Sequence, residues 1–65
     1  MKSGKERKNI AIGKKVSIVQ KHHQRTAQLT EGIVKRILTN VSTHLHGIKV
    51  QLETGEVGRV SKVID

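Results

Sequence analysis

The sequence predicts a mostly β domain, built as a small barrel of four or five short antiparallel strands. The apolar residues include eight Val and seven Ile, and β-branched side chains favour pleated strands over helices. Residues 48–52 alternate between apolar and polar side chains, as a strand with one buried face requires. Glu53 to Glu56 then places a glycine between two apolar segments, which is typical of a β-hairpin.

Length and composition limit the core to a thin aliphatic one. A chain of 65 residues forms one domain and buries only about 60% of its unfolded surface. Phe, Tyr, Trp and Cys are all missing, so neither disulfides nor a thiolate zinc site can reinforce the fold. No apolar run approaches the roughly 20 residues that span a bilayer, and no secretory signal follows the charged N-terminus. We expect a cytoplasmic monomer without membrane contact.

The N-terminal region is strongly basic. Six of the 13 basic residues lie within residues 1–15, against the single acid Glu6. Residues 1–9 show no apolar pattern after Met1, which predicts a flexible basic arm, and residues 10–65 form the predicted barrel domain. The first strand is expected over Lys15–Gln20, after a turn at Gly13.

Residues 21–28 are polar and basic, and they predict a long loop between strands. Such a loop on a small scaffold is a common place for ligand contact, although a solvated connector fits the same composition.

Residues 31–39 are compatible with two structures. Ile33, Val34, Ile37 and Leu38 have helical spacing, and Thr30 would cap such a helix. Gly32 and the β-branched residues disfavour a helix. A strand containing a bulge explains the same pattern, because a small barrel buries parts of both strand faces. We favour the strand.

After a second polar loop at residues 40–46, the chain predicts a strand at 47–53, the hairpin turn at Gly55, and a last strand at 57–60. Val57 and Val60 cannot share one face in strict alternation, so a bulge is expected at Gly58. Residues 61–65 are expected to be a short tail. The predicted core contains Val16, Ile18, Ile33, Ile37, Ile48, Val50, Leu52, Val57 and Val60.

Two resemblances add to this interpretation. The segments Ile12-Gly-x-x-Val-x-Ile-Val, Gly32-Ile-Val-x-x-Ile and Ile48-x-Val-x-Leu resemble the KOW type of SH3-like barrel. KOW modules occur in ribosomal proteins and transcription factors, which implies RNA contact. More specifically, Gln24-Arg25-Thr26, Leu29-Thr30-x-Gly32-Ile33-Val34, Ile37-Leu38-Thr39, His44-x-x-Gly47-Ile48-Lys49-Val50-x-Leu52 and Gly55-x-Val57-Gly58-Arg59-Val60 together resemble the YwbE family. That family consists of very short bacterial proteins of uncharacterised function.

The charge balance points to a polyanionic partner. The chain carries 13 Lys and Arg against 5 acids, a net charge of +8, which favours phosphate binding with release of counterions. Without aromatic residues, bases cannot be stacked on side-chain platforms. Backbone and shape recognition of structured RNA, including ribosomal RNA, therefore remains. The candidate residues for this contact are Lys21, Arg25, Thr26, Lys35, Arg36, His44, Lys49 and Arg59.

Arg25 and Arg59 are the strongest candidates, because a guanidinium group can hold phosphate in bidentate geometry. The alternative for Arg59 is an ion pair with Glu53 or Glu56 across the hairpin, which would be weak at a surface.

Other chemistries are not expected. The pairs His22-His23 and His44-x-His46 could approach a metal ion, but the sequence offers no cysteine beside them, so we predict no metal site and no cofactor. A core this small can hardly enclose a catalytic pocket, and we expect neither an enzyme nor a small-molecule substrate. The alternative function is a protein-docking module that uses a strand edge or an aliphatic patch around Val34 and Leu38.

Overall fold

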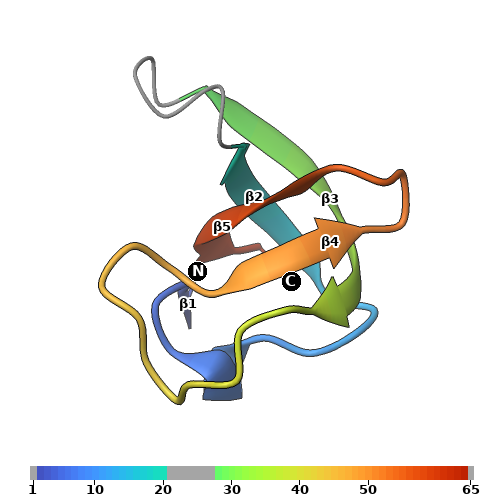
Figure 1. Ribbon diagram of the computed structural model, residues 1–65. Coiled ribbons are helices and arrows are strands. Elements are labelled where there is room, and N and C mark those ends of the chain that lie inside the picture. Colours follow the sequence, from blue (N-terminus) through green and yellow to red (C-terminus); the bar gives the residue numbers. More distant parts are fainter. Residues whose placement is uncertain (1, 21–27, 65) are drawn as a thin grey trace.

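The computed structural model describes residues 2–20 and 28–64 of the chain. It contains the strands β1 (Lys2–Ser3), β2 (Lys15–Gln20), β3 (Leu29–Ile37), β4 (Lys49–Leu52) and β5 (Val57–Val63), with a short 3-10 helix η1 (Arg7–Asn9). The strand order is β1-β5-β2-β3-β4, and β4 also pairs with β5. Strands β2 to β5 thereby close into an antiparallel barrel (Figure 1). The predicted small β barrel is confirmed.

No helix in the described part of the chain is long and apolar enough to cross a membrane.

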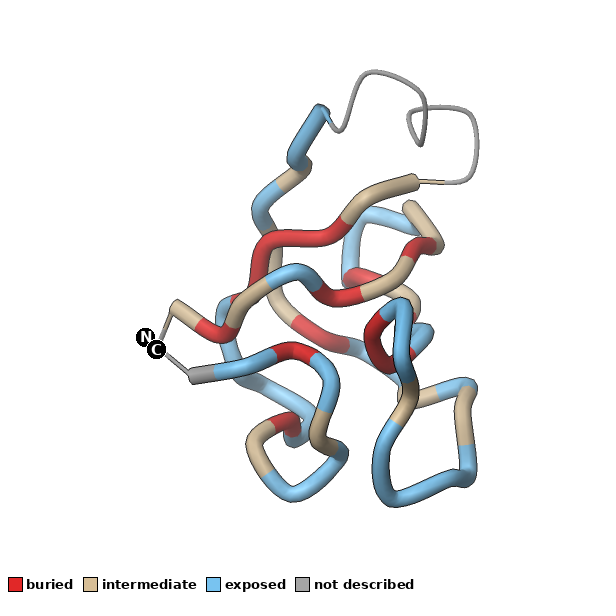
Figure 2. The backbone as a smooth tube through the Cα atoms, turned by 90° about the vertical axis from the view of Figure 1, so that its left-hand side faces the viewer, coloured by how far each residue is buried: buried red, intermediate tan, exposed pale blue. Residues whose placement is uncertain are grey.

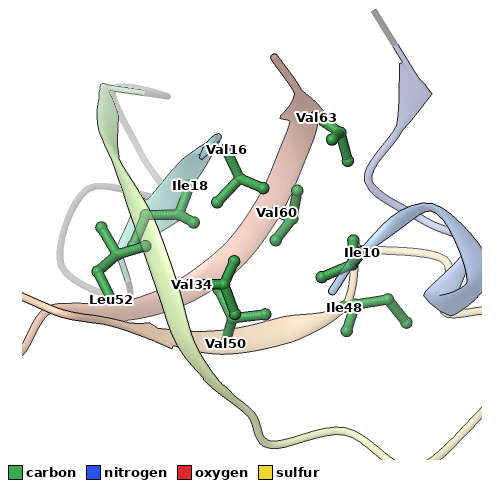
Figure 3. Packing of buried hydrophobic residues seen from close by; sticks show 9 residues of the cluster. All are labelled: Ile10, Val16, Ile18, Val34, Ile48, Val50, Leu52, Val60 and Val63. Carbon is green, nitrogen blue, oxygen red and sulfur yellow. The ribbon is translucent and has the colours of Figure 1, made fainter. Parts of the chain in front are cut away.

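The barrel interior is filled by aliphatic side chains from all four barrel strands and from the segments before β2 and β4 (Figure 3). Six of the predicted core residues are buried there. Ile33 and Val57 are only half-buried, and Ile37 packs against the cluster from its edge. The full cluster consists of Ile10, Val16, Ile18, Val34, Ile48, Val50, Leu52, Val60 and Val63.

Strand β3 contains a bulge, which explains its ambiguous sequence pattern. Val34 pairs with Leu52, whereas Arg36 pairs with Gln51, so Lys35 is an extra residue in the ladder. The bulge resets the alternation, and Ile37 returns to the core side. The strand interpretation of this stretch is confirmed.

The same bulge places Val34 and Leu38 on opposite sides of the sheet, against the expectation of a shared aliphatic patch. Val34 is fully buried in the core, while Leu38 remains 45% exposed. The aliphatic patch that the sequence suggested around these two residues is therefore not a surface patch.

Strand β5 also has a bulge, but not where the sequence placed it. Val50 pairs with Gly58 in regular register with β4. Opposite β2 the register shifts so that Ser61 is the extra residue. Val57 points away from the core, and Gly58 takes the inward position instead. Because of the shift at Ser61, Val60 and Val63 both reach the core, so residues 61–63 belong to a barrel strand and the predicted tail there is wrong.

The turn between β4 and β5 agrees with the prediction. Gly55 has a φ of 101°, a conformation that favours glycine. Its N–H donates to the carbonyl of Leu52 at 2.9 Å, which closes the hairpin.

The N-terminal segment lies against the barrel (Figures 1 and 2). Strand β1 pairs with the end of β5 at Val63. The N–H of Arg7 donates to the carbonyl of Ser42 at 2.8 Å, and Ile10 is buried in the core. Residues 2–9 thus differ from the free arm expected from their polarity, because backbone hydrogen bonds and the apolar Ile10 hold this segment in place.

Candidate nucleic-acid interface

Five of the eight candidate binding residues lie in the described part of the chain. Lys21, Arg25 and Thr26 lie outside it. Three of the five, Arg36, Lys49 and Arg59, share the outer surface of β3, β4 and β5, and we call these three residues the cationic face. Lys35 and His44 occupy other positions.

Strand alternation places the cationic face outward. On β4, Val50 and Leu52 are fully buried, so Lys49 and Gln51 point to the opposite side. Arg36 pairs with Gln51 and Arg59 pairs with Lys49. Residues that pair directly across a sheet point to the same side, and the cations therefore gather on one outer surface over three neighbouring strands.

Lys49 and Arg59 are direct cross-strand neighbours. Side chains in such a position have Cβ atoms roughly 4.5–5.5 Å apart, and like charges there are destabilising. On its other side, Arg59 is opposite the apolar Val19. On the other side of Lys49, its carbonyl accepts a hydrogen bond from the N–H of Leu38 at 2.8 Å. Neither cation has an acidic cross-strand partner.

The guanidinium group of Arg59 is oriented by neutral oxygens. Nη1 donates to Thr39 Oγ1 at 3.4 Å and to the carbonyl of Gly47 at 3.3 Å. Thr39 Oγ1 also accepts from the backbone N–H of Lys49 at 3.0 Å. Both bonds from Arg59 are long for N–H···O geometry. Because both acceptors are neutral, they orient the guanidinium without neutralising its charge. Within the described residues, Nε and Nη2 donate no hydrogen bond.

Gly47 is required at its position for two reasons. Its φ is 99°, and a Cβ added there would lie 2.3 Å from the carbonyl oxygen of Val60. Only glycine lets the backbone pass this close to β5 with that conformation. The carbonyl that accepts from Arg59 is consequently held in a fixed place.

Little of the positive charge is neutralised by ion pairs. Among residues 2–20 and 28–64, the one ion pair joins Lys8 Nζ to Glu6 Oε2 at 3.5 Å. The alternative pairing of Arg59 with Glu53 or Glu56 is therefore not formed. Instead, the Glu56 carboxylate accepts a hydrogen bond from the Thr54 hydroxyl. That bond, followed by one from the backbone N–H of Glu56, lowers the pKa of Glu56 below its ordinary value.

The other two described candidates lie apart from the shared face. Lys35 is the exposed extra residue of the β3 bulge, next to Arg36 in the chain. His44 is half-buried, and its N–H donates to the carbonyl of Lys5 at 2.9 Å. Its Nδ1 accepts from the N–H of His46 at 3.1 Å, which assigns the ring proton of a neutral His44 to Nε2.

The histidine pairs do not form a metal centre within the part that the structure describes. There, no three His, Asp or Glu side chains come together as a metal site would require. His22 and His23 lie outside the described residues.

The structure also reveals features that the sequence did not indicate. Thr39 and Gly47 orient Arg59 from positions 20 and 12 residues earlier in the chain, so no local spacing predicts their role. An open groove, lined by residues of polar and charged types, lies between the N-terminal segment and the segment before β4. Its lining residues are Glu6, Arg7, Lys8, Asn40, Ser42 and Thr43.

Comparison with known proteins gives the family. A family model described as "Uncharacterized conserved protein (DUF2196)" matches residues 3–63. The "Uncharacterized protein YwbE" of Bacillus subtilis (strain 168) is 48% identical over 62 residues, covering 95% of each chain. No solved structure matches the chain. The resemblance to the YwbE family is confirmed, and the chain belongs to this family of uncharacterized conserved proteins.

Proposed function

We propose that this protein is a small basic β-barrel module that binds structured RNA through phosphate-backbone and shape contacts. The observation that carries the proposal is the cationic face. Arg36, Lys49 and Arg59 share one outer surface, and none of them is within 4 Å of a carboxylate among the described residues.

The chemistry of this face suits phosphates better than bases. Each phosphate that a cation neutralises releases condensed counterions, which favours binding at low salt. The chain contains no aromatic residue, so splayed bases would find no stacking platform. Contacts to phosphates and 2′-hydroxyls of a folded RNA need only a fixed arrangement of donors. The ribosome is one candidate partner of this kind.

The three side chains would have different roles. Arg59, oriented by Thr39 and Gly47, would present its Nε and Nη2 donors to a phosphate in bidentate geometry. Lys49 would add a mobile point charge, and Arg36 would extend the contact to the neighbouring strand. Lys21, Arg25, Thr26, Lys35 and His44 remain further candidates for the same interface.

The test compares two RNAs at one fixed salt concentration. The ratio of affinities for an RNA hairpin and for a single-stranded homopolymer is measured for the natural chain and for a variant with Arg36→Gln, Lys49→Gln and Arg59→Gln. The control variant carries Lys14→Gln, Lys15→Gln and Lys62→Gln, which removes the same charge from positions outside the cationic face. We expect the hairpin preference to fall only in the first variant, because only its residues share one outer surface and include the oriented Arg59. Equal ratios in the two variants would show that the cationic face does not discriminate RNA shape.

If the natural chain shows no salt-sensitive binding to any RNA, the nucleic-acid proposal fails. The alternative function is then the protein-docking module, which would retain a protein partner after nuclease treatment and a high-salt wash.

A further inference from the structure

The Lys49–Arg59 pair places two positive charges opposite each other, with no carboxylate within 4 Å among the described residues. We propose that these two residues form the binding site of a single phosphate group, and that the pair destabilises the free barrel until an anion bridges it. This inference rests on the proposed function, because it places one RNA phosphate on the cationic face.

The first step is the missing neutralisation. The two cations face each other directly across β4 and β5, a position in which like charges repel. The cross-strand neighbour of Arg59 on β2 is Val19, and among the described residues neither cation has a carboxylate within 4 Å. The fold therefore contains a repulsion that an opposite charge at this point would remove.

The second step is preorganisation. Thr39 Oγ1 accepts hydrogen bonds from both members of the pair, from the backbone N–H of Lys49 and from Arg59 Nη1. The carbonyl of Gly47 holds the same Nη1 from the other side. Arg59 therefore has its orientation before a ligand arrives, so less conformational entropy is lost on binding. Phosphate, with several acceptor oxygens, can bridge the guanidinium fork and the ammonium group together.

The third step is the consequence for stability. Some charged residues serve ligand binding although a neighbouring like charge repels them. Replacing such a residue with a neutral one should stabilise the fold and weaken binding. Lys49 is exposed, and Gln has an aliphatic stem with a polar, uncharged head, so Lys49→Gln leaves the core unchanged. Lys15→Gln is the matched control, because Lys15 is also an exposed strand residue but is opposite the apolar Ile33.

The first measurement is thermal unfolding at low ionic strength. We expect Lys49→Gln to raise Tm by roughly 1–5 °C more than Lys15→Gln does, from the usual size of a cross-strand pair in a small domain. The control subtracts the general relief of net positive charge. The difference should shrink in high salt, which screens the repulsion.

The second measurement uses inorganic phosphate against chloride at matched ionic strength. Phosphate should raise the Tm of the natural chain and of Lys15→Gln, but raise that of Lys49→Gln less. In NMR titrations the backbone signals of Thr39, Gly47 and Lys49 and the Arg59 Nε–H signal should move together in the natural chain.

The outcomes separate this inference from the proposed function. Equal Tm gains in the two variants, or a phosphate response that Lys49→Gln leaves intact, would overturn the proposed phosphate-binding site. Salt-sensitive RNA binding could then still support the proposed function. A phosphate response confined to chains with Lys49, without any RNA binding, would support an anion-binding site at this pair and overturn its assignment to RNA.

Discussion

The two faces of the β4–β5 hairpin differ sharply, although their residues alternate along the same two strands. The inner face is aliphatic and fully buried, and it supplies a large part of the core. The outer face has two opposed cations, of which the Arg59 guanidinium is oriented by neutral oxygens. Inner positions are Val50, Leu52, Gly58 and Val60, and outer positions are Lys49, Gln51, Val57 and Arg59.

Together with the proposed function, this difference predicts that stability and ligand binding can be changed separately in a very small protein. Burial of the inner side chains is favourable without any partner. Under the proposed anion site, the charges on the outer face become favourable only when an anion is present. Each substitution below changes one face and should leave the other property largely unchanged, except at Gly47, where the two meet.

The largest effect is expected for Gly47→Ala. An added Cβ would lie 2.3 Å from the Val60 carbonyl at a φ of 99°, so backbone strain and a steric clash should together cost roughly 2–5 kcal/mol. Chemical denaturation measures this loss, and the RNA affinity of the folded fraction should fall because the carbonyl that orients Arg59 moves.

Gly55→Ala is its control. Gly55 has a similar φ of 101°, but a Cβ there would meet no atom within 4 Å. This variant should lose less stability and keep its RNA affinity. Equal losses would mean that the close approach of Gly47 to β5 does not matter.

The next effect concerns the inner face alone. Val50→Ala should lower the free energy of unfolding by about 1–3 kcal/mol, through lost apolar burial and the remaining cavity. Urea denaturation measures this change, and Val41→Ala, at a position that is 47% exposed, should be close to neutral. A loss of RNA affinity in folded Val50→Ala protein would contradict the independence of the two faces.

The sequence predicted the inner face better than the outer one. Alternation at residues 48–52 identified Ile48, Val50 and Leu52 correctly, because a half-buried strand imposes a period of two on its own residues. The pattern failed where bulges at Lys35 and Ser61 changed the period. Since bulges depend on the pairing of two strands, the single-chain pattern misassigned Val57 and missed Val34 and Val63.

The candidate site was predicted only as a set of residue types. Basic residues were named from charge, but the opposition of Lys49 and Arg59 depends on the register of the hairpin. The role of Thr39 depends on a contact across 20 residues, which no local pattern contains. The N-terminal segment was misjudged for the same reason: its polar side chains carry no apolar period, while its backbone hydrogen bonds to residues 42–48 hold it in place.

A smaller effect is expected for Arg59→Lys, which changes the outer face without changing its charge. The bidentate fork is lost, while a point charge remains. Affinity for an RNA hairpin should fall by about tenfold or less, in line with the roughly 0.5–1.5 kcal/mol that one hydrogen bond contributes on balance when the charge is retained, and the salt dependence should stay nearly the same. An unchanged affinity in this variant would mean that Arg59 acts through charge alone, against the orientation by Thr39 and Gly47.

The smallest effect belongs to the hairpin turn. The hydrogen bond from Thr54 lowers the pKa of Glu56 below its ordinary value of 4.5. A lowered folded-state pKa contributes stability above the unfolded value, and that contribution is lost as pH falls through the folded pKa. Thr54→Ala should therefore raise the pKa of Glu56 and slightly reduce stability near neutral pH, with the difference vanishing in acid. An NMR titration of the Glu56 side chain measures this, and an unchanged pKa would contradict the role of the Thr54 hydroxyl.

The most direct test of the separation between the two faces is the salt dependence of RNA hairpin binding. The natural chain is compared with the double variant Lys49→Gln and Arg59→Gln, and with the control Lys15→Gln and Lys62→Gln of equal charge. For the first variant we predict an unchanged or higher Tm and a slope of log K against log salt that is shallower by roughly 0.7–0.9 for each phosphate contact removed. For the control, the slope should stay close to that of the natural chain. Identical slopes in the two variants, or a loss of Tm in the first, would contradict a binding face that is separate from the core.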